Sequence, residues 1–129
     1  MIVLETSALV AMVVGEPVAP DLFRRASLAS GLLLPAHCFL EAHIVLARRF
    51  PPAMLLTLDE VVARLGAEVH PFTPAHLALA RDAFLRFGKG RHPAALNFGD
   101  CMSYAVAKAE GLPLLHVGED FGRTDVGRA

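Results

Sequence analysis

The chain has 129 residues, which is the size of one domain. With 54% apolar and 19% charged residues, it is too apolar for a disordered tail and can form a hydrophobic core without disulfides. Twelve Lys and Arg against thirteen Asp and Glu give a formal charge of −1. That balance argues against a protein that coats nucleic acid with its whole surface, but it allows a local basic patch.

Short apolar segments alternate with helical patterns along the chain. Met1–Leu4 is predicted to be a buried strand, and Ala8–Val14 a helix that is capped by Thr6 or Ser7 and ended by Gly15. The later predicted elements are a helix over 17–30, a strand over 32–34, helices over 35–49 and 52–65, a strand over 68–70, helices over 74–87 and 97–110, and a strand over 114–117. Residues 88–96 form a loop, and a polar tail begins at 118. This alternation predicts a single α/β domain over 1–129, with a short parallel sheet covered by helices on both faces.

Cysteine usage and the apolar runs indicate the compartment. Cys38 and Cys101 lie in apolar helical patterns without a CxxC spacing, which is typical of free buried thiols in a reducing environment. The longest apolar run, Ala8–Val14, is much shorter than the ~20 residues of a membrane span. We therefore expect a cytoplasmic protein without a membrane segment.

Four acidic residues from distant parts of the chain fall at one edge of the predicted sheet. Glu5 follows the first strand, Asp120 follows the last, and Glu41 and Asp100 lie in early turns of helices that start at the same edge. Clustered carboxylates repel one another unless a cation neutralises them, and ligands that are all oxygen suit Mg²⁺ or Mn²⁺. Such a site can activate water and stabilise charge in phosphodiester hydrolysis.

Each of these acids also has a purely structural explanation. Asp100 lies three residues after Asn97, at a capping-box spacing, and Glu5 could cap the helix that follows it. Glu41 could pair with a basic residue of its own helix, and Asp120 could be a solvated turn residue. The prediction therefore depends on the convergence of the four acids and not on any one of them.

The histidines raise the possibility of a zinc site. His37, Cys38, Glu41 and His43 are close in sequence. However, the HExxH motif is absent, and no second Cys or His pair has a finger-like spacing. We therefore do not predict a zinc site in this chain.

Three segments resemble the motifs of a known family. Residues 2–9 (IVLETSAL) are similar to the first-strand motif of PIN-domain ribonucleases, an Asp followed by Thr or Ser, then Ser and Ala. Residues 88–101 (GKGRHPAALNFGDC) and 114–125 (LLHVGEDFGRTD) resemble the long motif and the closing motif of the VapC toxin branch of that family. The resemblance covers essentially the whole chain.

The resemblance implies a Mg²⁺- or Mn²⁺-dependent endoribonuclease, the toxin of a toxin–antitoxin pair, which cleaves structured RNA. It also implies a homodimer and a VapB-like antitoxin whose tail enters the acidic groove. The catalytic acids of the family carry over onto Glu5, Glu41, Asp100 and Asp120, of which Glu5, Asp100 and Asp120 are the expected metal ligands. Supporting roles are expected for Thr6, Ser7 and Asp125. The expected RNA contacts are Lys89, Arg91, His92 and Arg123.

Glu5 departs from the family pattern, which has Asp at this position. The added methylene moves the carboxylate by about an ångström, and Mg²⁺ tolerates distorted coordination poorly. Misplacements of this size cost ~10²-fold in rate. The alternative to an RNase is therefore an inactive PIN-fold module that binds RNA or antitoxin, and a structure-specific DNA nuclease would use the same chemistry.

Overall fold

Four short strands form a parallel sheet in the order β3-β2-β1-β4 in the computed structural model, which describes residues 1–129. The strands are β1 (Ile2–Leu4), β2 (Leu32–Pro35), β3 (Glu68–His70) and β4 (Leu114–Leu115). β1 pairs with β2 on one side and with β4 on the other, and each strand pair is parallel. Parallel neighbours need crossover connections, which helices supply here. The predicted fold class is confirmed.

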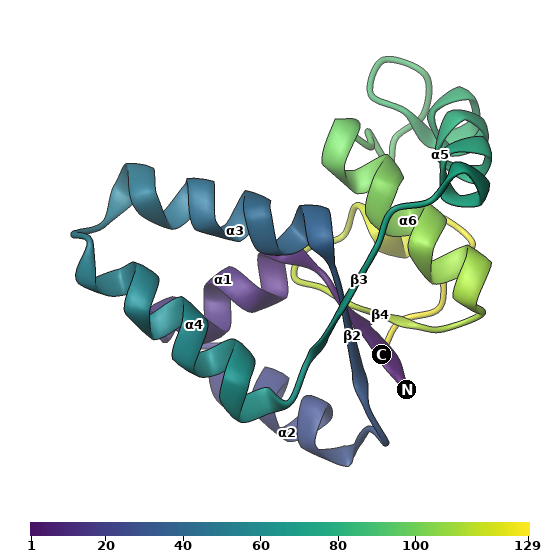
Figure 1. The fold of residues 1–129 in the computed structure, drawn as a ribbon. Coiled ribbons are helices and arrows are strands. Elements are labelled where there is room, and N and C mark those ends of the chain that lie inside the picture. Colours follow the sequence, from purple (N-terminus) through teal and green to yellow (C-terminus); the bar gives the residue numbers. More distant parts are fainter.

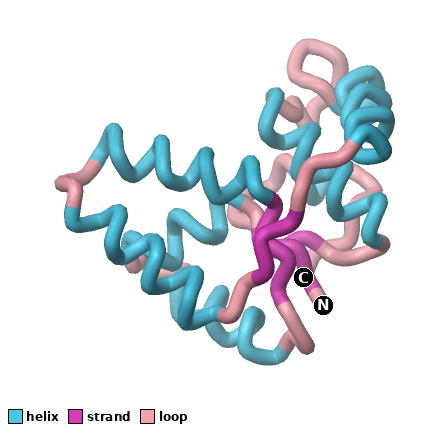
Figure 2. The backbone as a smooth tube through the Cα atoms, viewed as in Figure 1, coloured by secondary structure: helices cyan, strands magenta, loops and turns pink.

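Six helices cover the two faces of this sheet. They are α1 (Thr6–Val14), α2 (Ala19–Leu28), α3 (Ala36–Arg49), α4 (Ala53–Leu65), α5 (Pro74–Phe87) and α6 (Phe98–Glu110). In Figure 1, α1 to α4 lie on one side of the strands, and α5 and α6 lie on the other. Figure 2 shows the strands between these two groups of helices. No single helix is long and apolar enough to span a membrane, and the one pair that qualifies by length and composition, α1 with α2, is bent by 119°.

Alternate residues of the central strands face the two helical layers. Ile2 and Leu4 belong to the core cluster beneath α1 to α4, whereas Val3 belongs to the cluster beneath α5 and α6. On β2, Leu33 shares the second cluster with Val3. Because side chains of a strand alternate between faces and both faces are covered, every position must be apolar. This explains why β1, β2 and β4 are continuous apolar runs in the sequence, whereas the exposed edge strand β3 contains Glu68 and His70.

The start of α1 and the end of β4 differ from the prediction for one shared reason. α1 begins at Thr6 and is capped by Glu5, rather than by Thr6 or Ser7. β4 ends at Leu115 and not at residue 117, since the backbone N–H of Val117 donates to the Ser7 hydroxyl (2.9 Å) and not to a neighbouring strand. Ser7 is therefore occupied by a contact between distant segments instead of by helix capping.

Two other segments also correct the sequence prediction. α2 spans residues 19–28 rather than 17–30, since Ala19 N donates to Glu16 O and closes a turn ahead of the helix. The C-terminal segment is polar, as predicted, but it also makes regular backbone hydrogen bonds. It contains a 3₁₀ helix at Phe121–Arg123, and Leu114 N then donates to Gly127 O (2.8 Å). The chain end is thus paired with the outer edge of β4.

Candidate active site

The buried carboxylate of Glu5 lies where β1 ends and α1 begins. Its side chain is only 4% exposed, and Oε2 accepts hydrogen bonds from the backbone N–H of Ser7 (2.8 Å) and from the Ser7 hydroxyl. The Ser7 Oγ atom also accepts the N–H of Val117, just beyond β4. Ser7 therefore fixes Glu5 and joins the carboxyl ends of the two strands.

Burial raises the pKa of Glu5 from its ordinary 4.5 to about 7. The hydrogen bonds from Ser7 oppose this shift because they stabilise the carboxylate. The nearby negative charges of Asp100 and Glu41 raise the pKa further. Glu5 is thus a partly protonated acid near neutral pH, in electrostatic contact with carboxylates from α3 and α6.

Asp100 combines a capping role with a place in this acidic environment. Its backbone N–H donates to Asn97 Oδ1 (2.9 Å), and the N–H of Asn97 donates to Asp100 Oδ2 (3.0 Å), which completes a capping box at the start of α6. Burial raises the pKa of Asp100, the bond from Asn97 lowers it, and the charges of Asp120 and Glu41 raise it again. The capping explanation is correct but incomplete, since the second carboxylate oxygen makes no protein hydrogen bond.

Glu41 reaches the site because α6 carries a glycine opposite it. A Cβ atom placed on Gly99 would lie 2.9 Å from Glu41 Oε2, so any larger residue there would displace this carboxylate. Glu41 forms none of the ion pairs of the chain, but it interacts electrostatically with His37 of its own helix, since burial lowers the pKa of His37 and the charge of Glu41 opposes that shift. Its position is explained by the close approach of α3 to α6.

Glu5, Glu41, Asp100 and Asp120 form what we call the acidic cluster. Asp100 interacts electrostatically with the other three, and Glu5 also interacts with Glu41. The structure thus brings together the four acids that the sequence placed at one edge of the sheet. Their mutual repulsion is a cost that a bound cation would relieve.

The donor chemistry of the acidic cluster fits Mg²⁺ or Mn²⁺, because every ligand is an oxygen. The hydroxyl of Thr6, the residue after Glu5, is buried without a hydrogen-bond partner. No three residues of the cluster bring ligand atoms within 4.8 Å of one another. Mg²⁺ usually keeps several waters and binds through one or two carboxylates, so this wider spacing suits an ion held partly through water.

Asp125, predicted to support the acids, has other partners in the structure. Its carboxylate accepts a hydrogen bond from the Tyr104 hydroxyl and lies 3.4 Å from both Arg86 and Lys108. These contacts hold the C-terminal segment against α5 and α6. These contacts therefore indicate a structural role for Asp125 and no direct role beside the acidic cluster.

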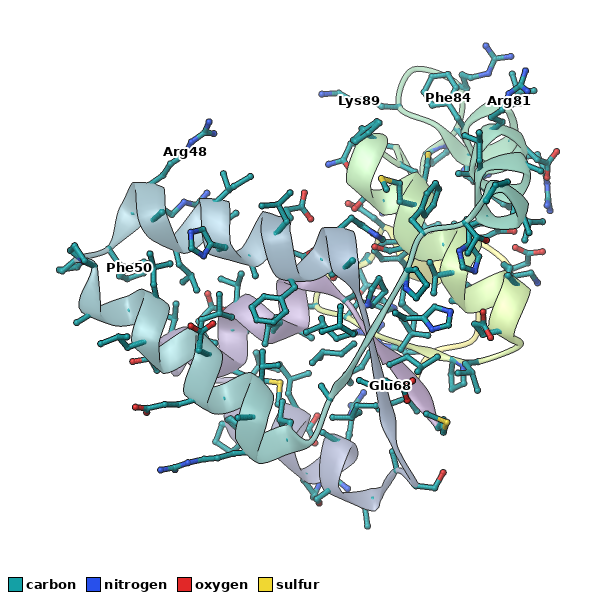
Figure 3. All side chains as sticks on the ribbon, in the orientation of Figure 1. Arg48, Phe50, Glu68, Arg81, Phe84 and Lys89 are labelled. Carbon is teal, nitrogen blue, oxygen red and sulfur yellow. The ribbon has the colours of Figure 1, made fainter.

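Three of the four predicted RNA-contacting residues make hydrogen bonds to the backbone, and the fourth does not. Arg91 and Arg123 each donate to a backbone carbonyl, at 3.2 and 3.1 Å, and His92 accepts a backbone N–H through Nδ1 (3.0 Å). These three contacts shape the loop between α5 and α6. Lys89 is exposed and forms no ion pair, and it projects away from the molecule in Figure 3.

A hollow beside Glu41 contains two residues that were not predicted as RNA contacts. Arg48 and Phe98 line it together with Glu41 and Gly99. Arg48 lies two helical turns after Glu41, a spacing that could have revealed the shared face. Phe98 is 85% exposed and stands within the Asn-Phe-Gly-Asp motif, where its exposure was not evident. Figure 3 shows Arg48 and Lys89 projecting on the same side of the molecule, one from α3 and one from the loop after α5.

Comparison with known proteins identifies the fold and the relatives of this chain. The family model described as PIN domain matches residues 2–127. VapC ribonuclease Mb2004c of Mycobacterium bovis is 43% identical over 125 residues, which cover 96% of this chain and 90% of that protein. Ribonuclease VapC28 of Mycobacterium tuberculosis is 41% identical over 128 residues, which cover 98% and 96%.

Two solved structures share the fold. Mycobacterium tuberculosis VapC20, described as a toxin that cleaves the sarcin-ricin loop, superimposes with a TM-score of 0.81 at 20% identity and covers 100% of this chain and 98% of its own. A toxin–antitoxin complex from Klebsiella pneumoniae matches with a TM-score of 0.72 at 11% identity, covering 97% and 93%. The resemblance inferred from the sequence motifs is confirmed.

Replacing Glu5 by Gln should stabilise the metal-free protein at alkaline pH. Because the pKa of Glu5 is raised on folding, its contribution to stability is full below pH 4.5 and is lost as the pH rises through 7. Gln keeps the shape and an acceptor for Ser7 without the charge. We expect Glu5→Gln to be more stable by about 2–3 kcal/mol at pH 8 and about equally stable at pH 4.5.

Urea unfolding at both pH values in EDTA measures this difference. Glu16→Gln is the matched control, since Glu16 is exposed and its removal should change stability little at either pH. If Glu5→Gln were no more stable than the wild type at pH 8, Glu5 would carry no buried charge at that pH.

Proposed function

We propose that this chain, which belongs to the PIN domain family and within it to the VapC ribonucleases, is a metal-dependent endoribonuclease that acts as the toxin of a toxin–antitoxin pair in the cytoplasm. The observation that carries the proposal is the acidic cluster at the carboxyl edge of the sheet. The relatives of this chain over nearly its full length are named ribonucleases. Structured RNA is the proposed substrate, in line with the description of VapC20.

The cluster residues have distinct proposed roles. Glu5, Asp100 and Asp120 hold a Mg²⁺ or Mn²⁺ ion, directly or through water, and Glu41 completes the catalytic set. When bound, the ion supplies charge neutralisation at the phosphate and a lower pKa for a coordinated water. Ser7 keeps Glu5 in place, and the free hydroxyl of Thr6 is available to orient a water.

The scissile strand is held by basic residues around the acidic cluster. Lys89 and Arg48 are the side chains that project freely beside the site, and we assign phosphate contacts to both. Arg91, His92 and Arg123 support the same loop through their backbone hydrogen bonds and present their remaining donors to RNA. Positive charge near an acidic centre lets the polyanion approach it.

A VapB-like antitoxin is the proposed protein partner. The likeness to a toxin in complex with its antitoxin supports such a partner. The acidic cluster would attract a basic side chain of that partner, which would neutralise the same repulsion that a metal ion relieves. Binding of antitoxin and binding of metal would then compete.

The identity of residue 5 should control the rate of cleavage. Glu5 takes up its extra methylene by turning back onto Ser7 as the cap of α1. An Asp can also cap a helix, and it would present its carboxylate as the family does. We expect Glu5→Asp to increase Mg²⁺-dependent cleavage about 10–10²-fold, with a smaller gain in Mn²⁺. The measurement is cleavage of a structured RNA across a metal titration.

Two variants control this experiment. Asp100→Asn keeps the capping geometry but removes a charge of the site, so activity should fall at least about tenfold while the melting temperature is preserved. Asp59→Asn, at an exposed position of α4, should change neither. Higher activity of the wild type than of Glu5→Asp would show that the site is adapted to Glu. If the wild type and Glu5→Asp are equally inactive at saturating metal, the chain is a binding module without turnover.

Lys89→Ala should weaken RNA binding without altering the fold. Measured in the Asp100→Asn background to prevent cleavage, the slope of log affinity against log salt should become shallower by about one unit, the value for one lost phosphate contact. Arg64→Ala on α4 removes an exposed charge of the same sign and should leave the slope unchanged. An unchanged slope for Lys89→Ala would mean that Lys89 faces only solvent.

We further propose that the chain forms a homodimer through an apolar patch next to the site. The patch consists of Leu40, Ile44, Phe84 and Phe98, which are between 40% and 85% exposed. Phe98 lines a hollow with Leu40 and Ile44 and a second hollow with Phe84, so the patch is continuous from α3 to α5. Contiguous apolar surface of this kind marks protein interfaces.

Sedimentation of the wild type and of Phe98→Ser tests the homodimer. We expect the wild type to be dimeric at micromolar concentration and Phe98→Ser to shift toward monomer, because it removes the most exposed apolar side chain of the patch. Leu28→Ser on α2 is the control, since Leu28 is 75% exposed outside the patch and its loss should not change the mass. A monomeric wild type would contradict the proposal.

A further inference from the structure

Two histidines and a glutamate from three different elements meet away from the acidic cluster. His70 ends β3, His76 lies in the first turn of α5, and Glu110 is the last residue of α6. His70 Nε2 lies 2.9 Å and His76 Nε2 lies 3.4 Å from the same atom, Glu110 Oε1. All three ligand atoms lie within 4.8 Å of one another, and no other three His, Cys, Asp or Glu residues of the chain do so.

We propose that His70, His76 and Glu110 bind one transition-metal ion of the Zn²⁺ class. Two imidazoles and one carboxylate form a ligand set that zinc uses in proteins, whereas Mg²⁺ prefers oxygen ligands alone. Ligands at 2.0–2.2 Å from a tetrahedral zinc lie about 3.3–3.5 Å apart. The observed separations from Glu110 Oε1 are 2.9 Å, below this range, and 3.4 Å, within it, so the ligand atoms already lie close to coordinating separations.

The burial of the three ligands also suits a metal site with one open position. His76 is buried, with 3% of its side chain exposed, and the side chains of His70 and Glu110 are 22% and 34% exposed. A buried ligand loses little conformational freedom when the metal binds. The two partly exposed ligands leave access for the ion and for water as a fourth ligand.

The hydrogen bonds of His76 determine how this site must work. The backbone N–H of Thr73 donates to His76 Nδ1 (2.9 Å), so Nδ1 carries the lone pair and Nε2 carries the proton of the neutral ring. A metal at Nε2 would take the place of that proton, which would move to Nδ1, and the two facing donors, Nδ1–H and the Thr73 N–H, would then have to move apart. Metal binding therefore exchanges one capping bond of α5 for three metal–ligand bonds, and the ring keeps a single proton throughout.

The bound ion would add a link between α6 and the segment that connects β3 to α5. β3 is the outermost strand of the sheet, and the ion would tie its end to the start of α5 and to the end of α6. Asp100 lies at the opposite end of α6 from Glu110. The chain would then hold two classes of cation, selected by oxygen ligands at the acidic cluster and by imidazoles here.

Zn²⁺ titration of the full-length, EDTA-treated chain by calorimetry tests the proposal, with excess Mg²⁺ present to occupy oxygen-only sites. We expect one equivalent of Zn²⁺ to bind and to raise the melting temperature. His70→Ala and Glu110→Gln should each weaken binding at least about tenfold, as even outer-shell changes do at metal sites. Glu110→Gln retains an oxygen that can accept hydrogen bonds from both histidines, so we expect this variant to fold like the wild type.

His43→Ala is the matched control, since it removes an exposed histidine on α3 that is not a proposed ligand, and it should bind like the wild type. Nitrogen NMR of the histidines gives an independent readout, in which Zn²⁺ should move the His76 proton from Nε2 to Nδ1. Absence of Zn²⁺ binding, or binding that both ligand variants retain in full, would overturn the proposal. None of these readouts requires RNA cleavage, so the result is independent of the proposed ribonuclease activity.

Discussion

The arrangement of the molecule depends on β1, a three-residue strand at the centre of the sheet that is buried on both faces. Because Val3 and Leu4 are fully enclosed, the residue that follows them is also inside the protein. That residue is Glu5, so the topology forces a carboxylate into a position where ionisation is costly. The helices that start at the same edge bring further acids toward Glu5. The site therefore consists of carboxylates whose ionisation is disfavoured by burial and by one another.

The fold tolerates this charge because two of the acids also serve the backbone. Glu5 caps α1 through Ser7, and Asp100 caps α6 through Asn97, so each carboxylate satisfies N–H groups that would otherwise lack partners. These local bonds offset part of the repulsion within the acidic cluster. The capping and the metal-binding explanations of these residues are therefore not alternatives, since one oxygen can serve the helix while the other faces the site.

The sequence by itself determined the secondary structure and the meeting of the acids. Short apolar runs bounded by turn residues indicated buried strands, and parallel strands place their carboxyl ends at one edge, so the acids that follow β1 and β4 were expected at the same edge. The Asn97–Asp100 spacing likewise predicted a capping box that the structure contains. These inferences succeed because backbone hydrogen bonding and burial follow local patterns of residue type.

Side-chain partners were decided only by the tertiary structure. Ser7 bonds to Val117, 110 residues away, and Asp125 is engaged by Tyr104 instead of by the acidic cluster. The close approach of Glu41 to Gly99 likewise depends on how α3 packs against α6. No periodicity encodes such contacts, because they depend on how segments that are remote in sequence pack together. That packing decides which donor lies within hydrogen-bond distance of an acceptor.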